Sequence, residues 1–270
     1  MPATKTTKRT KIEKPIVRGP ARKRSPRRSR RNGVAPKSGN RPGFLYRWFR
    51  RLALLGVVLA TLPFALILAY APSGVQPIST LMVRDWATDG GYVREWVPLE
   101  EFPDVLIASV LASEDGKFCQ HNGVDWSAVA TVVQQAFKGE RPRGASTVTM
   151  QTVKNLFLPA NRSVVRKAIE VPLAGVADFV WGKRRTLEIY LNIAEWAPNH
   201  FGAGAAARVW FGKDVRSLNR SEAARLAVTL PNPYIRNPAD PGPRVMALAR
   251  LNEQRAREMD PYLGCLDEVG

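Results

Sequence analysis

The sequence predicts a mainly α-helical domain that follows one membrane-spanning helix. Beyond residue 71, apolar residues recur at helical spacing and strand-like alternation is scarce, whereas residues 52–71 contain no charged side chain. The 270 residues suffice for one sizeable core, or for one domain with appendages. Because no internal repeat or low-complexity tract follows Ala71, we expect residues 72–270 to form a single domain.

The N-terminal segment carries nearly all of the net charge of +18. Residues 1–51 contain 18 Lys or Arg and a single acid, Glu13, whereas the remaining 219 residues hold 23 basic and 22 acidic side chains. Residues 1–43 cannot bury enough apolar surface to fold, so we expect disorder there. A nucleic-acid or anionic-lipid role for residues 1–51 is an alternative, but we favour a solvated cytoplasmic tail that directs membrane insertion.

Residues 52–71 are predicted to cross a membrane as one helix. Twenty residues at about 1.5 Å each span roughly 30 Å, the thickness of the hydrocarbon core. Arginines within residues 47–51 precede the run, which by the positive-inside rule keeps the N-terminus in the cytoplasm and exports the rest. Residues 69–71 resemble a signal-peptide cleavage site, but Pro72 and the length of the run favour a retained anchor.

Helical patterns dominate the exported part, which we expect to contain eight to ten helices. The expected ranges are 103–114, 125–138, 147–157, 163–181, 184–195, 202–210, 221–229 and 240–259. Start signals are Pro103-Asp104, Asp125, Ser146, Ser163 and Ser221-Glu222. Residues 81–93 are the best candidate for a short hairpin. The two cysteines, Cys119 and Cys265, are compatible with a disulfide or with two free thiols.

Glu114 ends a helix that is apolar on nearly every face and should therefore be buried. Burial and the negative end of the helix dipole both raise the pKa of a carboxyl group there. Such a group suits a general acid or base near neutral pH. The alternative is that Glu114 and Asp115 pair with Lys117 or His121 at a solvated helix end.

Residues 141–157 contain hydroxyl groups at a helix start and a nearby cation, Lys154. Ser146 can cap the helix, and this arrangement is competent to bind phosphate oxygens, although the segment by itself favours an ordinary Ser N-cap on an amphipathic helix. Farther along, Arg166 and Glu170 have the spacing of a surface ion pair. Because Pro172 should kink the helix just past them, we interpret this cluster as part of a site.

Four segments, in order and in spacing, resemble the motifs of the peptidoglycan glycosyltransferases, a family shared by class A penicillin-binding proteins and stand-alone enzymes. They are Glu114-Asp115-x-x-Phe118-x-x-His121-x-Gly123-x-Asp125, Gly144-Ala-Ser146-Thr147-Val-Thr149-Met150-Gln151, Arg166-Lys167-x-x-Glu170 and Lys183-x-x-x-Leu187-Glu188-x-Tyr190-Leu191-Asn192. Residues 192–202 resemble the variant typical of monofunctional biosynthetic enzymes of Gram-negative bacteria, and no SxxK transpeptidase motif is present. Met150 stands where the family has Gln, so a hydrogen-bonding group is lost there.

The resemblance implies a lysozyme-like helical domain with a smaller membrane-facing lobe, anchored as a single-pass protein of the bacterial inner membrane with its catalytic domain in the periplasm. It implies polymerisation of lipid II into glycan strands for cell-wall biogenesis and cell shape. The partners implied are lipid II, the growing strand, the membrane and cell-wall synthesis or division proteins, with no specific nucleic acid.

The resemblance also assigns site residues. Glu114 and Glu170 would be catalytic, Glu114 as general base in an inverting transfer that releases undecaprenyl pyrophosphate. The substrate-binding residues would be Asp115, Phe118, His121, Ser146, Thr147, Gln151, Lys154, Asn155, Arg162, Arg166 and Lys167. Glu170 would either order the cations or hold a divalent metal, Mg or Mn.

Two other functions compete with this interpretation. A lysozyme-like glycan hydrolase or lytic enzyme would also place a Glu at a helix end, but it has no pyrophosphate leaving group to stabilise with the cations at 154–167. A membrane-tethered nucleic-acid or scaffold protein would act through residues 1–51. Glu188 and Asn192 are expected to be structural.

Overall fold

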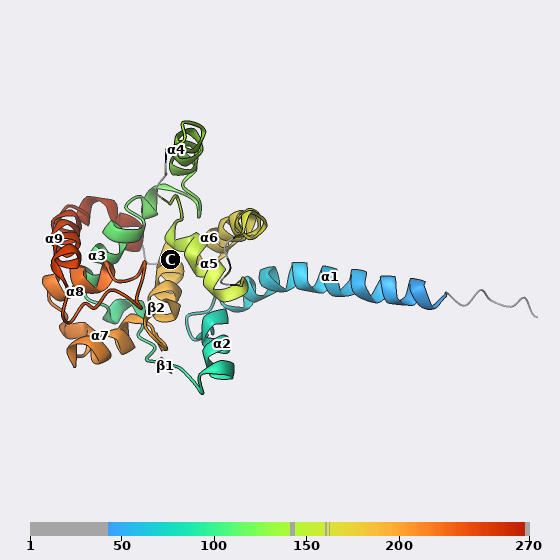
Figure 1. Cartoon of the computed structure of the whole chain (residues 1–270), viewed down its shortest axis with the longest axis horizontal. Helices are drawn as coiled ribbons and strands as arrows, with labels where there is room; N and C mark the ends of the chain where they lie inside the picture. The colour runs from blue at the N-terminus through green and yellow to red at the C-terminus, as the bar shows by residue number, and fades with distance from the viewer. Residues whose placement is uncertain (1–42, 141–143, 160, 162, 268–270) are drawn as a thin grey trace, which may run out of the picture. The chain divides into compact units, whose positions relative to one another are not determined.

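The computed structural model describes residues 43–140, 144–159, 161 and 163–267 (Figure 1). The chain divides into two compact units, residues 1–47 and 48–270. Apart from Gly43, the segment for which disorder was expected lies outside the described residues.

The described part of the chain is mainly α-helical, which confirms the expected fold class. Its α-helices are α1 (Phe44–Ala69), α2 (Thr80–Thr88), α3 (Asp104–Glu114), α4 (Trp126–Phe137), α5 (Val148–Phe157), α6 (Val164–Ile193), α7 (Ala203–Phe211), α8 (Arg220–Ala227) and α9 (Pro243–Arg257). Short 3₁₀ turns are η1 (Leu99–Glu101), η2 (Phe118–Gln120), η3 (Val215–Ser217), η4 (Asp260–Tyr262) and η5 (Gly264–Leu266). The strands are β1 (Val93–Arg94), β2 (Glu195–Ala197) and β3 (His200–Phe201).

Helix α1 is long and apolar enough to cross a membrane, judged by length and composition. It begins at Phe44 and therefore includes the arginines that precede the uncharged run. Its C-terminal end is fixed to α6, because the Trp181 indole N–H donates to the carbonyl of Ile67 at 2.7 Å. The Arg185 guanidinium donates to the carbonyls of Tyr70 and Val75, at 3.0 and 2.5 Å, and so holds the segment that follows.

The expected hairpin at residues 81–93 is wrong. Residues 80–88 form α2, because the Ser79 hydroxyl caps the helix by accepting the N–H of Met82 and because Met82 and Asp85, three residues apart, are buried on one face. Only residues 93–94 are extended, as β1. This strand pairs in parallel with β3, which pairs antiparallel with β2.

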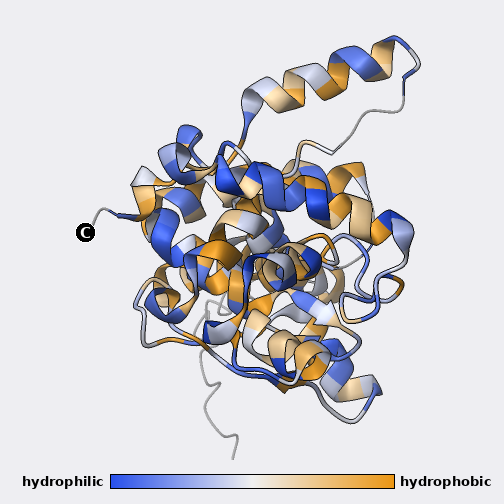
Figure 2. Ribbon diagram, turned by 90° about the vertical axis from the view of Figure 1, so that its left-hand side faces the viewer, coloured by the Kyte–Doolittle hydropathy of each residue, from blue (hydrophilic) through white to orange (hydrophobic). Residues whose placement is uncertain are grey.

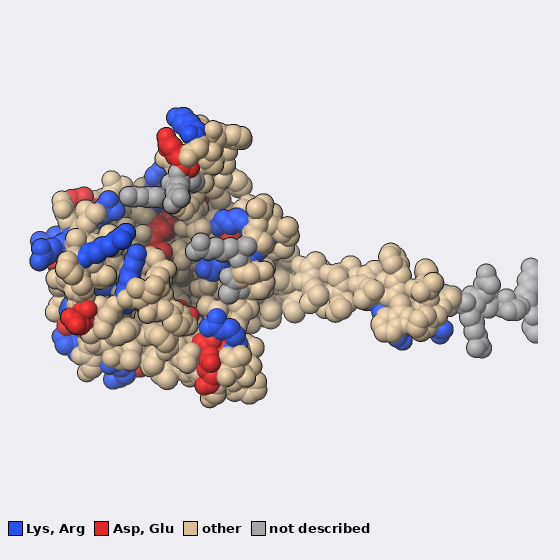
Figure 3. All heavy atoms as spheres, viewed as in Figure 1, with Lys and Arg blue, Asp and Glu red and all other residues tan. Residues whose placement is uncertain are grey.

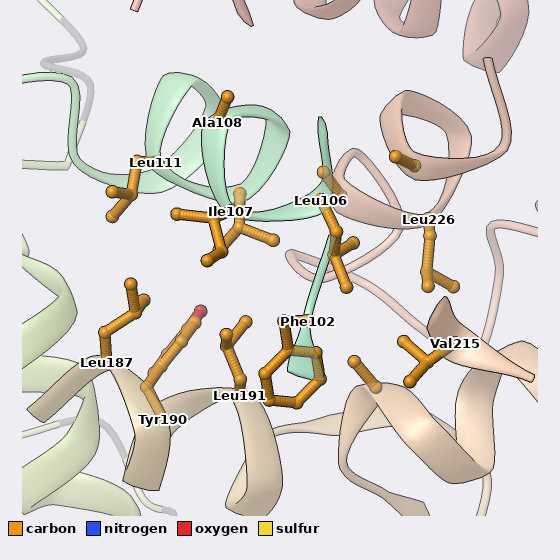
Figure 4. Packing of buried hydrophobic residues seen from close by; sticks show 14 of the residues in the cluster. Phe102, Leu106, Ile107, Ala108, Leu111, Leu187, Tyr190, Leu191, Val215 and Leu226 are labelled. Carbon is orange, nitrogen blue, oxygen red and sulfur yellow. The ribbon is translucent and has the colours of Figure 1, made fainter. Parts of the chain in front are cut away.

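The middle of helix α3 is buried on all sides, as its sequence predicts, whereas its two ends are partly exposed. Residues 106–111 are all buried, and Leu106, Ile107 and Leu111 pack over Leu187, Tyr190 and Leu191 of α6 (Figure 4). Helices α8 and α9 also pack against α3. By contrast, α4 buries none of its residues, and it stands away from the other helices at the top of Figures 1 and 2.

Helix α6 is interrupted at a different residue from the one expected. Gly182 has the positive φ of 65° that breaks the helix, whereas Pro172 keeps helical dihedral angles. The kink expected just past Glu170 is therefore wrong. Since the break separates residues 164–181 from 183–193, it lies where the sequence placed the boundary between two expected helices.

Residues 115–125, between α3 and α4, are fastened to the rest of the domain at several points. A disulfide joins Cys119 to Cys265, which resolves the open question about the two cysteines. The Lys183 ammonium donates to the carbonyl of His121 at 2.5 Å and lies over the Phe118 ring. Gly123 has a φ of 80°, and a Cβ there would lie 2.4 Å from the carbonyl oxygen of Ala174.

Gly123→Ala should lower the free energy of unfolding by about 2 kcal/mol or more, because it combines an unfavourable φ with a clash against helix backbone. The matched control is Gly116→Ala in the same loop, where an added Cβ meets nothing within 4 Å and φ is not positive. Denaturant unfolding of both variants in detergent tests this. Equal stability of the two variants would contradict the close packing of Gly123 on α6.

Candidate active site

An open cleft of about 930 Å³ brings together residues from four parts of the sequence. It is lined by Glu114, Gly144, Ser146, Gln151, Lys154, Ser163, Val164, Arg166, Lys167, Glu170, Leu230 and Pro231. In the space-filling view of Figure 3, acidic side chains lie in a hollow on the face shown, with basic side chains on both sides of it. The cleft therefore combines carboxylates with a cationic wall.

Glu114 is the last residue of α3, and its carboxylate lines the cleft. Its Oε2 accepts a hydrogen bond from Gln151 Nε2 at 3.1 Å, and its Oε1 accepts one from the Ser113 hydroxyl at 3.1 Å. Burial raises the pKa of Glu114, while Gln151, Ser113, Arg236 and Lys154 act in the opposite direction and favour the carboxylate. Of the alternative in which Glu114 and Asp115 pair with Lys117 or His121, only the contact between Asp115 and His121 is found, because Lys117 donates to Ser127.

Asp115 faces away from the cleft and connects α3 to α5. Its Oδ2 accepts the backbone N–H of Val148, the first residue of α5, at 2.8 Å, and its carboxylate lies 2.9 Å from His121 Nε2. The Phe118 ring is buried edge-on against His121. These three residues, expected to bind substrate, lie behind Glu114 and are not among the residues that line the cleft.

At the start of α5, Ser146 and Thr147 have different roles from those expected. Thr147 is the N-cap, because its hydroxyl oxygen accepts the Met150 N–H, and its O–H donates to the carbonyl of Gly123 at 2.6 Å. Ser146, predicted to be the cap, instead lines the cleft and accepts a hydrogen bond from the Lys167 ammonium at 2.9 Å. Of these two residues, Ser146 therefore lines the cleft and Thr147 does not.

Arg166 and Lys167 share one buried carboxylate, Glu170. Arg166 Nη1 pairs with Oε1 of Glu170, and Lys167 Nζ lies 2.9 Å from Oε2. Glu170 itself is only 2% exposed. Because both oxygens already bind cations, this carboxylate does not fit the role of a metal ligand, and no cluster of three metal-binding side chains occurs among the described residues.

Lys154 lies between the two carboxylates of the cleft. Burial lowers the pKa of its ammonium; Glu170 and Glu114 raise it, whereas Arg166 and Lys167 lower it. Asn155, the next residue, is buried outside the cleft, and its carbonyl accepts the Thr80 hydroxyl at 3.0 Å. Arg162, expected to join the cations, lies outside the described residues.

Some of the cleft was not predicted from the sequence. Leu230 and Pro231 form a wall from a segment more than a hundred residues beyond Glu114. Tyr190 donates its O–H to Gln151 Oε1 at 3.3 Å, which turns the amide N–H group of Gln151 toward Glu114. The sequence of Leu230 and Pro231 indicates an apolar turn after α8, but their spacing does not indicate that they lie near Glu114.

Glu188 and Asn192 are structural, as expected. Glu188 pairs with Arg185 at 2.7 Å, and Asn192 exchanges two hydrogen bonds of 2.8 Å with the backbone of Val97. Both side chains are buried. Asn192 holds the segment before η1 against the second half of α6, whereas Glu188 binds Arg185 of its own helix.

Comparison with known proteins places the chain in a family. A family model described as Transglycosylase matches residues 83–258. A biosynthetic peptidoglycan transglycosylase of Mesorhizobium japonicum is 53% identical over 224 residues, which cover 83% of this chain and 95% of the relative. Proteins of the same name from Rhizobium meliloti and Brucella suis are 50% and 49% identical, covering 80% and 81% of this chain and 92% and 99% of theirs. The chain belongs to the transglycosylase family.

Proposed function

We propose that this protein is a peptidoglycan transglycosylase that polymerises lipid II into glycan strands by an inverting transfer. One observation carries the proposal: a half-buried carboxylate with a raised pKa, Glu114, shares a cleft with Ser146, Lys154, Arg166 and Lys167. A proton acceptor and an anion-binding wall are the two parts that such a displacement needs. The names of relatives up to 53% identical support the same substrate class.

In the proposed step, Glu114 takes the proton of the acceptor's sugar hydroxyl. The hydroxyl oxygen forms a bond to the anomeric carbon of the lipid-linked strand as the bond from that carbon to the pyrophosphate oxygen breaks. The pyrophosphate leaves with the electron pair, and the configuration at the carbon inverts. Gln151 and Ser113 hold the two oxygens of Glu114 in place and favour the ionised form before the transfer.

Negative charge develops on the pyrophosphate as it leaves. Lys154, Arg166 and Lys167 line the cleft beside the hydroxyl of Ser146, so preorganised donors surround an anion there. A glycan hydrolase releases a neutral sugar hydroxyl, so its leaving group carries no charge for these cations to stabilise. The cations therefore favour transfer from a lipid pyrophosphate over glycan hydrolysis.

The proposed substrate also accounts for α1. The polyprenyl tail of lipid II is confined to a bilayer, and an enzyme anchored by a spanning helix is confined to the same bilayer. We propose a single-pass inner-membrane protein with residues 1–51 as a cytoplasmic tail, 52–71 as the membrane span and 72–270 as a periplasmic catalytic domain. The basic tail and the uncharged run support this orientation.

The full chain in detergent, supplied with lipid II, should produce long glycan strands on a gel. Glu114→Gln should lower the rate by about 10²–10⁴-fold, since it removes the proton acceptor and changes little in shape. Glu258→Gln, an exposed substitution at the end of α9, is the control and should keep full activity. An active Glu114→Gln variant, or shortening of preformed glycan by the wild type without polymerisation, would contradict the proposal.

The pH dependence should respond to Gln151. Activity rises with pH through the pKa of Glu114, because the base must be ionised. Gln151→Met removes a donor that lowers this pKa, so the acidic limb of the rate profile should move to higher pH. Gln134→Met, on the exposed surface of α4, is the control. An unshifted limb in Gln151→Met would show that another group sets it.

Lys154→Gln should lower kcat by about 10²–10³-fold with lipid II, since a preorganised charge beside the leaving group is lost. Lys138→Gln, at the exposed end of α4, serves as the matched charge control. Steady-state kinetics of both variants measure the effect. Were the two variants equally active, the leaving group would have to bind elsewhere.

A further inference from the structure

A second, smaller pocket lies beside the end of α3, where Ser113 precedes Glu114. It has a volume of about 170 Å³ and is lined by Ala112, Ser113, Val228, Arg236, Leu248, Leu251, Asn252 and Arg255. We refer to it as the Arg236 pocket. None of these residues lines the cleft.

The Arg236 pocket and the cleft are neighbours, because the same two segments form both. Ser113 lines the pocket and donates to Glu114, which lines the cleft. Residues 228–236 likewise contribute to both: their ends, Val228 and Arg236, line the pocket, while Leu230 and Pro231 line the cleft. A substrate with its reacting atoms at Glu114 therefore needs only a short branch to reach the pocket.

The charge in the Arg236 pocket is not neutralised within the described residues. Arg236 donates to the carbonyl of Val228, which is neutral, and neither Arg236 nor Arg255 forms an ion pair with a described carboxylate. In the cleft, by contrast, Arg166 and Lys167 already share Glu170. Two guanidinium groups at the mouth of a small pocket favour an anion, and above all a planar carboxylate.

Asn252 narrows the choice of anion. It is 5% exposed, its amide N–H donates to the carbonyl of Ser109 at 2.9 Å, and its Oδ1 is buried with no donor among the described residues. A buried acceptor needs an N–H or O–H partner. A peptide end supplies a carboxylate and an amide N–H together, whereas a pyrophosphate supplies only acceptors at neutral pH.

The remaining walls are apolar and suit a small side chain. Val228, Leu248 and Leu251 line the pocket between the arginines and Ala112. We propose that the Arg236 pocket binds a carboxylate-bearing end of the peptide carried by the sugar substrate. This inference rests on the proposed function, which supplies a peptide-bearing substrate, and it assigns the pocket a role in substrate specificity.

The first test is binding of N-acetyl-alanyl-alanine to the full chain in detergent, measured by ligand-observed NMR for both the L,L and the D,D peptide. The acid should bind at least about tenfold more tightly than its C-terminal amide, because a charge-assisted hydrogen bond is lost in the amide. Arg255→Gln should abolish this preference. Arg250→Gln, an exposed arginine on the same helix outside the pocket, should keep it.

The second test is kinetic and uses lipid II with either a free or an amidated peptide terminus. The amide should raise KM about tenfold with kcat unchanged, and Arg255→Gln should raise KM for the acid but not for the amide. Arg255 is preferred to Arg236 for this purpose, since the charge of Arg236 also acts on Glu114.

Equal binding of the acid and the amide would overturn the inference. Displacement of the peptide by inorganic pyrophosphate, if it required Arg255, would also overturn it, because the pocket would then be a phosphate site. The inference would also be overturned if Arg255→Gln raised KM equally for lipid II with a free and with an amidated peptide terminus. Absence of any polymer from the wild type would overturn the proposed function instead, and the binding measurement would still decide whether the pocket recognises a peptide carboxylate.

Discussion

The hydrogen bond from the Val148 N–H to the Asp115 carboxylate positions the rest of the site. It joins the residue after the end of α3 to the first residue of α5, over 2.8 Å and largely out of water. A negative charge at a helix N-terminus is favourable, so the contact stabilises α5 as well as the junction. One turn later, Gln151 faces Glu114. It acts together with the hydrogen bonds from Thr147 to Gly123 and from Gln151 to Glu114, which also hold the start of α5 beside the end of α3 and the loop that follows it.

The ionised form of Glu114 is destabilised by its position, and its neighbours offset only part of this destabilisation. Its burial disfavours the carboxylate, while Gln151, Ser113, Arg236 and Lys154 favour it. Tyr190 fixes the orientation of Gln151, and Tyr190 is itself held in the core between α3 and α6. The protonation of Glu114 thus depends on core packing, because the core sets both the desolvation of its carboxylate and the position of the Gln151 donor.

Helical periodicity was enough to predict most of α3 to α9, since each of these helices except α4 buries residues in the core. It failed at residues 81–93, where two glycines and alternating residues suggested strands. Two contacts decide the structure there: the Ser79 hydroxyl caps α2, and one face of α2 is buried by tertiary packing. Helical periodicity reports neither of them. The same limit applies at Ser146 and Thr147. Either hydroxyl could cap α5, and the choice follows from the position of Lys167 and Gly123, which no local pattern contains.

The resemblance in sequence brought together the right segments for the cleft but could not tell a lining residue from a supporting one. Asp115, Phe118 and His121 lie in the same motif as Glu114, yet they point behind it, because successive residues at a helix end diverge in direction. Arg236, Leu230 and Pro231 approach Glu114 from a distant segment, through the packing of α8 against α3. That contact depends on the whole helical arrangement.

Glu170 shows why the cationic wall can be held in place before any anion arrives. Three like charges in one cleft repel, and burial lowers the pKa of Lys154 further. A buried carboxylate that binds Arg166 and Lys167 offsets this repulsion and fixes both side chains, at the cost of partly neutralising them. In the proposed reaction, an arriving pyrophosphate then meets donors whose positions are already set, with Lys167 also held by Ser146. In the proposed reaction, Glu170 therefore acts on the leaving group through the cations it orders, so its charge matters there even though both of its oxygens are occupied.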